Sequence, residues 1–333
     1  MTKTEETLFL TRSEVASLLG LAECIDAVEE AFKLHAEGLS LPPGVLETLT
    51  GDGGFHIKAA GLKLAGGNYF AAKVNGNFPL NPERFGLPTI QGVVVLYDAE
   101  RGRPLAVMDS MELTALRTAA ATGVAARYLA RPDSKVVTVC GCGIQGRAQL
   151  RAIAEVLRIE RVYAFDRDDA RAESFAREMS EELEAKVEAV ADLRKAAGES
   201  DVCVTCTPSR RPVFMSGDVR PGAFIAAVGA DNPLKQELDP GLLASGKIVV
   251  DILEQCASIG DLHHAIEAGA ITRSDVYAEL GEIVAGRKLG RTSAEEITIF
   301  DSTGTALQDV AAASVVYEKA LRAGVGVSLN LAS

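Results

Sequence analysis

Residues 136–146 read VVTVCGCGIQG, an apolar β-rich run that is followed at once by three spaced glycines. The next stretch, residues 145–157, is rich in alanine and leucine and predicts a helix. Gly141 permits a tight turn, Gly143 lets the backbone approach a pyrophosphate, and Gly146 allows the helix to pack closely on the strand. The helix N terminus would offer N–H donors to the phosphates. We therefore predict a dinucleotide-binding turn, with a glycine-rich turn that binds no ligand as the alternative.

An acidic residue follows the second predicted strand, at the position where dinucleotide-binding folds contact the ribose. The strand-like run VYAF, residues 162–165, ends at Asp166, about 25 residues beyond the first glycine. A carboxylate there accepts hydrogen bonds from a ribose 2′-hydroxyl and repels a 2′-phosphate, which favours NAD over NADP. Arg167 follows directly and leaves NADP open as an alternative cofactor.

Strands and helices alternate after Pro132, which predicts an α/β fold with a doubly wound parallel sheet of the Rossmann type. The predicted strands are residues 135–140, 161–166, 187–190, 202–206, 223–228 and 247–251. Residues 132–307 are expected to form this dinucleotide-binding domain.

The first 131 residues have a different pattern, typical of an α+β unit. The stretch TRSE, residues 11–14, has capping-box spacing before a short helix, and PPG at 42–44 is expected to break the chain. Strand-like and helical runs follow at 45–50, 55–62, 69–76, 89–98 and 111–130. A helical tail, residues 304–323, is expected to return to this unit, so that residues 1–131 and 308–333 form one substrate-binding and dimerisation domain.

Composition limits the classes of function. The 34 Lys and Arg residues against 46 Asp and Glu give a formal charge of −12, which argues against a nucleic-acid partner. No apolar run approaches the roughly 20 residues of a membrane span, and the first seven residues lack the pattern of a signal peptide. These observations predict a soluble, cytoplasmic protein with no membrane association.

The six cysteines lie in apolar segments, which is typical of free thiols in a reducing compartment. CVTC at 203–206 fits the CxxC formula of metal and redox sites, but residues three apart in a strand point to opposite faces. The four histidines show no zinc-ligand spacing. We therefore predict no metal site, with a metal or redox role for the CxxC pair as the alternative.

Three charged side chains are candidates for chemistry. Asp231 directly follows the apolar run 223–228, where ligands of open α/β sheets bind, although a turn or helix-capping aspartate is the alternative. Lys73 lies in a strand-like run. Arg117 lies on a helical face of small and apolar residues, where it either reaches solvent or pairs with an anion.

Motifs along most of the chain resemble those of the ornithine cyclodeaminase/μ-crystallin family, which includes archaeal-type alanine dehydrogenases and cyclic ketimine reductases. They are KVNGNFP at 73–79, GLPT at 86–89, PLAVMD at 104–109, LRTAA at 116–120, GCGIQ at 141–145, VGAD at 228–231, AELG at 278–281, and STGTA at 302–306 with Gln308 and Asp309. The resemblance implies a homodimer in which Lys73 and Arg117 bind the substrate carboxylate, with Lys73 also catalytic, and Asp231 is the catalytic acid or base. It also implies cofactor contacts by Thr89, Arg117, Thr118, Gly141, Gly143, Ile144, Gln145, Gly146, Asp166, Thr207, Val228, Gly229, Lys235 and Ser302.

The chain departs from the family pattern at one position. Many members carry an arginine shortly after the proline-containing break, whereas residues 42–45 read PPGV here. His56 and Lys58 are the residues expected to take over part of its role in holding the substrate carboxylate. Ordinary strand residues are the alternative for both.

Three functions remain open at this point. The first is an NAD(P)-dependent reductase or dehydrogenase that interconverts a small α-imino or ketimine acid and an α-amino acid. The second is a cyclodeaminase that recycles NAD and releases ammonia from a diamino acid. No Asp or Glu stands between Asp52 and Glu83 to pair with a distal ammonium group, which favours the first. The third is a crystallin-like protein that binds ligands without catalysis.

Overall fold

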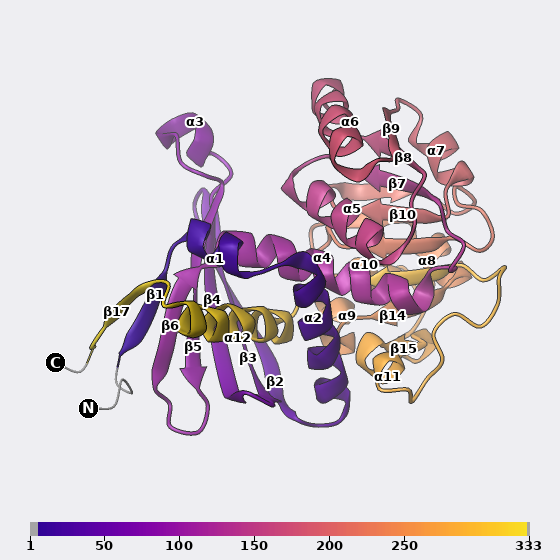
Figure 1. The fold of residues 1–333 in the computed structure, drawn as a ribbon. Helices are drawn as coiled ribbons and strands as arrows, with labels where there is room; N and C mark the ends of the chain where they lie inside the picture. The colour runs from indigo at the N-terminus through magenta and orange to yellow at the C-terminus, as the bar shows by residue number, and fades with distance from the viewer. Residues whose placement is uncertain (1–5, 332–333) are drawn as a thin grey trace. The chain divides into compact units, whose positions relative to one another are not determined.

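The computed structural model describes residues 6–331, so part of the segment tested for a signal peptide lies outside the described residues. The chain forms two compact units (Figure 1). Unit 1 comprises residues 1–117 and 305–333, and unit 2 comprises residues 118–304. The domain boundary after residue 131 stays a prediction. Among the described residues, no helix has both the length and the apolar character that crossing a membrane requires.

Unit 1 is built on a seven-stranded sheet in the order β17-β1-β6-β5-β4-β3-β2. Strands β2 to β6 follow one another along the chain as antiparallel neighbours, and β17 is antiparallel to β1. Only the pair of β1 and β6 in this sheet is parallel. The strands are β1 (Thr7–Leu10), β2 (Ser40–Thr50), β3 (Gly53–Leu64), β4 (Gly67–Asn77), β5 (Ile90–Asp98), β6 (Pro104–Asp109) and β17 (Val327–Leu329).

The predicted chain break at residues 42–44 is wrong. Strand β2 runs through Pro42 and Pro43, and its pairing with β3 shifts register between Leu41 and Gly44. A bulge leaves residues outside the ladder, and β2 is an edge strand with a neighbour on one side only. Prolines without N–H donors are tolerated at such positions.

The helices of unit 1 follow their local signals. Thr11 caps α1 (Arg12–Leu18) in the predicted capping box with Glu14. Helix α12 (Ala306–Ala323), yellow in Figure 1, packs against α2 and against strands β3, β4 and β5. It is buried over most of its length, and its first turn brings Gln308 and Asp309 into the interior of the unit. The remaining helices are α2 (Leu21–Ala36), α3 (Asn81–Phe85) and the first turns of α4 (Ser110–Leu129).

Unit 2 contains an eight-stranded, wholly parallel sheet in the order β15-β14-β16-β12-β10-β7-β8-β9. The predicted α/β fold of the Rossmann type is therefore confirmed. The chain passes from β7 to β8 and β9 on one side and then to β10 on the other, so the switch point lies between β7 and β10. The strands are β7 (Val136–Cys140), β8 (Arg161–Phe165), β9 (Lys186–Ala189), β10 (Val202–Thr205), β12 (Phe224–Ala227), β14 (Lys247–Val250), β15 (Ala278–Glu279) and β16 (Thr298–Asp301).

The sequence did not predict four of the strands of unit 2. Strand β16 has four residues and strand β15 has two, and neither was identified from the sequence. Strands β11 (Arg210–Phe214) and β13 (Gln236–Leu238) form a separate two-stranded sheet. Besides the remainder of α4, the helices of the unit are α5 (Ile144–Val156), α6 (Asp169–Leu183), α7 (Leu193–Glu199), α8 (Pro240–Ser245), α9 (Leu253–Ile259), α10 (Asp261–Glu267) and α11 (Leu280–Val284).

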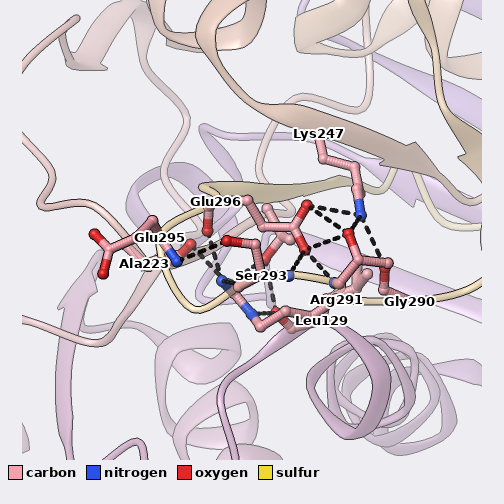
Figure 2. A network of polar contacts seen from close by, with 10 residues as sticks. Leu129, Ala223, Lys247, Gly290, Arg291, Ser293, Glu295 and Glu296 are labelled. Atoms are coloured by element: carbon pink, nitrogen blue, oxygen red, sulfur yellow. Dashed lines mark hydrogen bonds and ion pairs between the residues drawn. The ribbon is translucent and has the colours of Figure 1, made fainter.

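Arg291 fixes the irregular segment that precedes β16 (Figure 2). Its Nε donates to the carbonyl of Leu129 at the end of α4 at 2.7 Å. Its two Nη atoms donate to the carbonyls of Ser293, Glu296 and Ala223 and to the hydroxyl of Thr298. One guanidinium thus satisfies five acceptors from segments far apart in the chain.

Replacing Arg291 with methionine is expected to lower the free energy of unfolding by about 2–4 kcal/mol, because partly buried carbonyls lose a charged donor. Urea denaturation of both proteins measures the difference. Arg291→Lys keeps the charge but not the fork of donors, so it should fall between the two. Equal stability of the methionine variant and the parent would show that water replaces these bonds without cost.

Candidate functional site

The glycine turn of unit 2 has the geometry that the sequence predicts. Gly141 has a φ of 104°, and a Cβ there would lie 2.9 Å from the carbonyl oxygen of Cys206. A Cβ on Gly146 would lie 2.1 Å from the carbonyl oxygen of Gly141. Gly143 is the N-cap of α5, where no side chain caps the helix and a Cβ would meet open space. The first N–H groups of α5 are thus accessible to an anion.

A cavity of about 430 Å³ lies at the carboxyl ends of β7, β8 and β10. It is next to the switch point of the sheet, where open α/β folds bind their ligands. Most of its lining comes from the loops that follow these strands. The lining residues are Cys140, Gly141, Gly143, Phe165, Asp166, Arg167, Asp168, Arg171, Cys206, Thr207, Pro208, Ser209 and Val213.

Asp166 is held rigidly in the wall of this cavity. Its Oδ2 accepts a hydrogen bond from the backbone N–H of Cys142 at 2.9 Å, and its Oδ1 accepts one from Asp168 N–H at 3.1 Å. Arg171 Nη1 lies 3.7 Å from Oδ1, and Arg167 also lines the cavity. The position thus combines a fixed carboxylate with two neighbouring guanidinium groups.

Asp231 lies in the loop that follows β12, and its side chain is 50% exposed. Lys235 Nζ donates to its Oδ1 at 2.7 Å. Asn232, the next residue, makes a hydrogen bond within the turn, because its Oδ1 accepts from Leu234 N–H at 3.0 Å. Asp231 is therefore an accessible carboxylate beside an ammonium group, which suits an exchange of protons.

The other residues that are predicted to contact the cofactor lie in both units. Ile144 and Gln145 begin α5, and Ile144 is highly exposed although it is apolar. Val228 and Gly229 follow β12, while Ser302 follows β16 and donates to buried Asp251 at 3.0 Å. Thr118 belongs to the part of α4 in unit 2, and Thr89 stands just before β5 in unit 1.

Unit 1 contains a buried group of charges around Asp309. Lys73 Nζ lies 2.8 Å from Asp309 Oδ1, and Arg117 Nε lies 2.9 Å from the same oxygen. Arg117 Nη1 donates to Gln308 Oε1 at 2.6 Å. Lys58 on β3 pairs in register with Lys73 on β4. The exposed fractions are 3% for Lys73, 4% for Arg117, 8% for Lys58 and 1% for Asp309.

Two cations share one carboxylate in this cluster. Burial and the nearby Arg117 lower the pKa of Lys73 to about 7, although Asp309 opposes the shift. Burial raises the pKa of Asp309, but Arg117 and Lys73 outweigh burial and hold it below its usual value. Asp309 pairs with both Lys73 and Arg117, and the strand register places Lys58 opposite Lys73, where like charges destabilise a sheet. A small carboxylate would reduce the repulsion among these cations.

Three buried polar atoms of the cluster have no hydrogen-bond partner among the described residues, namely Asp309 Oδ2, Gln308 Nε2 and Arg117 Nε, which contacts Asp309 Oδ1 as an ion pair without hydrogen-bond geometry. Buried polar groups are normally paired, so these atoms are available to a bound polar ligand. His56, by contrast, has its Nε2 3.5 Å from Glu47 Oε1 on the neighbouring strand β2. Its role with the substrate stays a prediction.

The comparisons with known proteins agree with the motifs. A model of the ornithine cyclodeaminase/mu-crystallin family matches residues 5–324. The chain belongs to this family.

Members of the family resemble the chain over nearly its whole length. An alanine dehydrogenase of Archaeoglobus fulgidus is 46% identical over 98% of both chains. The structure of an archaeal alanine dehydrogenase dimer with bound NAD has a TM-score of 0.93 and 44% identity, covering 98% of this chain and 99% of that one. A Δ1-pyrroline-2-carboxylate reductase of Thermococcus litoralis, in complex with NADH and L-proline, has a TM-score of 0.91 and 37% identity, covering 97% of this chain and 100% of that one.

The structure also bears on the histidines and the cysteines. His263, His264 and Glu267 on α10 place one ligand atom each within 4.8 Å of the others, and the expected lack of a metal site stays a prediction. The helical repeat brings residues 263 and 267 together. All six cysteines are free, as predicted. Burial raises the pKa of Cys203 to about 12, which leaves this thiol protonated and unreactive.

Sequence reasoning missed two buried acids. Asp309 appeared only as part of a family motif, although a charged residue in the buried first turn of α12 was a usable signal. Glu237 gave no signal, because β13 has only three residues. Its carboxylate accepts hydrogen bonds from Thr207 N–H at 2.6 Å, Thr207 Oγ1 at 2.7 Å and Gly229 N–H at 2.8 Å.

Proposed function

We propose that this protein is an NAD-dependent oxidoreductase that interconverts a small α-imino or ketimine acid and an α-amino acid. The observation that carries the proposal is the buried cluster of Lys73, Arg117 and Asp309, which is built to receive a carboxylate. Membership of the family and the likeness to NAD-bound dehydrogenases and reductases support the reaction type. A nicotinamide cofactor, when bound, would supply or accept the hydride.

The chain's own residues would then orient the substrate and move its proton. Lys73 and Arg117 bind the carboxylate through charge-assisted hydrogen bonds, which fixes the position of the adjacent Cα. Asp231 gives a proton to the substrate nitrogen or takes one from it, and Lys235 stabilises its charged form. Gln308 Nε2 and Asp309 Oδ2 offer one unpaired donor and one unpaired acceptor to the polar groups of the substrate.

The residues of unit 2 fit a dinucleotide. The uncapped N terminus of α5 would receive the pyrophosphate, and Asp166 would accept from a ribose hydroxyl. The contacts proposed for Thr89, Gln145 and Ser302 have the family resemblance as their support. NAD is the cofactor in this proposal because Asp166 repels a 2′-phosphate.

Replacing Asp166 with asparagine is expected to raise the ratio of kcat/KM with NADPH to that with NADH by about ten-fold or more. The amide keeps one acceptor but removes the charge, and Arg167 and Arg171 then attract the extra phosphate. Steady-state kinetics with both cofactors measure the ratio. Arg171→Met in the same background is the control, and it should reverse part of the gain. An unchanged ratio in the asparagine variant would refute the role of this carboxylate.

Incubating the protein with NAD or NADH and a panel of amino, imino and keto acids tests the reaction itself. The proposal expects NADH to be consumed in proportion to the amino acid that forms. Release of ammonia from a diamino acid without net change in the cofactor would instead establish a cyclodeaminase. Binding of NADH without turnover of any substrate would establish a ligand-binding protein.

A homodimer and a cytoplasmic location complete the proposal. Apolar side chains of the edge strand β2 and its neighbour are exposed in unit 1, which suits a surface buried between two copies. They are Leu41, Val45, Leu46, Leu49 and Phe55. The six free cysteines suit a reducing compartment. Sedimentation velocity of the intact chain tests the dimer, and a monomer at micromolar concentration would exclude it.

A further inference from the structure

Glu237 links the ends of two neighbouring strands of unit 2. Thr207 stands in the loop after β10, and Gly229 stands in the loop after β12. These strands pair in parallel, with Thr205 opposite Ala227. The Glu237 carboxylate is fully buried, and it binds Thr207 through Oε1 and Gly229 through Oε2. It therefore holds both loops at the edge of the sheet where the cavity lies.

The close approach of the carboxylate depends on glycine. A Cβ at Gly229 would lie 2.3 Å from Glu237 Oε2 and 2.6 Å from the carbonyl oxygen of Thr207. No side chain fits there without displacing the carboxylate or the loop. Glycine is therefore required at position 229, because any Cβ would collide with the Glu237 carboxylate or with the Thr207 backbone.

The backbone that carries Glu237 is itself fixed from the other side. Asp261 Oδ1 accepts hydrogen bonds from the N–H groups of Glu237 at 2.7 Å and Leu238 at 2.8 Å. Asp301 Oδ2 in turn accepts from Leu262 N–H at 2.8 Å, one residue beyond Asp261. These bonds are all buried, so Glu237 has little freedom to move away from the two loops.

The hydrogen bonds that the Thr207 hydroxyl already makes determine whether it can donate to a ligand or accept from one. A hydroxyl has one proton to donate and two lone pairs that accept. The single proton of the Thr207 hydroxyl points to Glu237 Oε1, which also accepts from the Thr207 N–H. One lone pair accepts from Ser209 N–H at 3.2 Å. The remaining lone pair is free to accept from a ligand, and Thr207 lines the cavity.

We propose that Glu237 is a positioning residue that makes the Thr207 hydroxyl an obligatory hydrogen-bond acceptor for a donor group of the dinucleotide. This inference rests on the proposed function. The donor is either the carboxamide NH₂ or a ribose hydroxyl, which share this chemistry. Glu237 acts through Thr207 and Gly229, without contact with the cofactor.

Thr207→Val and Glu237→Gln test this role, with NADH fluorescence as the measure of binding. Valine keeps the shape but removes the acceptor, so the Kd for NADH is expected to rise about ten-fold. Glutamine has only one oxygen, so its NH₂ must face either the Gly229 N–H or the donors of Thr207. We expect a similar rise in Kd for that variant. Thr207→Ser keeps the hydroxyl and is the matched control, with a Kd close to that of the parent.

An NADH analogue with an acetyl group in place of the carboxamide separates a positioning role from a structural one. If the carboxamide is the donor, the parent binds the analogue more weakly than NADH, and both variants lose this difference. If a ribose hydroxyl is the donor, the variants bind both compounds about ten-fold more weakly than the parent does.

The outcome that would overturn the inference is an unchanged Kd for NADH in folded Thr207→Val. If Glu237→Gln fails to fold, the valine and serine variants still decide whether the Thr207 hydroxyl accepts from the dinucleotide, because Thr207 lines the cavity. Failure of the proposed function would look different, since the parent would then not consume NADH in proportion to an amino acid, whereas the effects of these variants on the Kd for NADH would remain.

Discussion

Asp231→Asn is expected to lower kcat for imine reduction by about 10²–10⁴-fold while leaving the Kd for NADH unchanged. The amide has nearly the same shape, and its oxygen can still accept from Lys235, whose Nζ lies 2.7 Å from Asp231 Oδ1. What it lacks is a group that can carry a proton to the substrate nitrogen. The absorbance of NADH, followed with the best substrate of the panel, gives kcat, and fluorescence titration gives the Kd.

Lys235→Met is the matched control for this prediction. It removes the ammonium neighbour but leaves the carboxylate, so kcat should fall much less than in the asparagine variant. Activity in Asp231→Asn within a few-fold of the parent would show that another group transfers the proton.

The nucleotide-binding half of unit 2 could be predicted because its constraints are local. Gly141 and Gly146 are needed for backbone reasons that act within a few residues of β7 and α5, and the sequence carries them as a compact pattern. Asp166 follows from the length of one strand–helix–strand unit. Short-range sterics of this kind leave the same mark in any chain that makes the turn.

The parts of the site that depend on tertiary pairing could not be predicted from single segments. Asp309 meets Lys73 and Arg117 only because α12 packs on β3, β4 and β5, more than 190 residues away from either cation. Lys58 and Lys73 face each other because of the register of β3 and β4. Each residue alone reads as an ordinary strand or helix residue, and only the assembled unit makes them a charge cluster.

The difference between local and long-range constraints also explains why the chain break predicted at residues 42–44 of β2 is wrong. Proline is read from sequence as a strand breaker, because it lacks the N–H that a central strand requires. On an edge strand with a register shift, the missing donor costs nothing. Whether a strand lies at an edge is decided by the order of the whole sheet, which the local sequence does not carry.

Lys73→Met is expected to raise the KM for the carboxylate substrate by about 30-fold or more, with the Kd for NADH unchanged. Methionine fills a similar volume, and Asp309 keeps its ion pair with Arg117 at 2.9 Å, so the fold should survive. The pH dependence should change as well. Lys73 has a pKa of about 7 in the free protein and is a cation below that pH, so substrate binding by the parent weakens as the pH rises through 7. The methionine variant should lack this step, which KM measured from pH 6 to pH 8.5 will reveal.

A second substitution separates the net charge of the cluster from the specific contact. Lys73→Met removes one positive charge, and adding Asp309→Asn removes the negative one, which returns the cluster to the net charge of the parent. If excess positive charge alone attracts the carboxylate, the double variant should recover most of the lost affinity. If the Lys73 ammonium donates directly to the substrate, KM should stay high in the double variant and the step near pH 7 should remain absent. We expect the second result, because a hydrogen bond to a charged group in a buried site depends on the donor's position as well as on the field. A KM equal to that of the parent in Lys73→Met would remove Lys73 from the substrate site altogether.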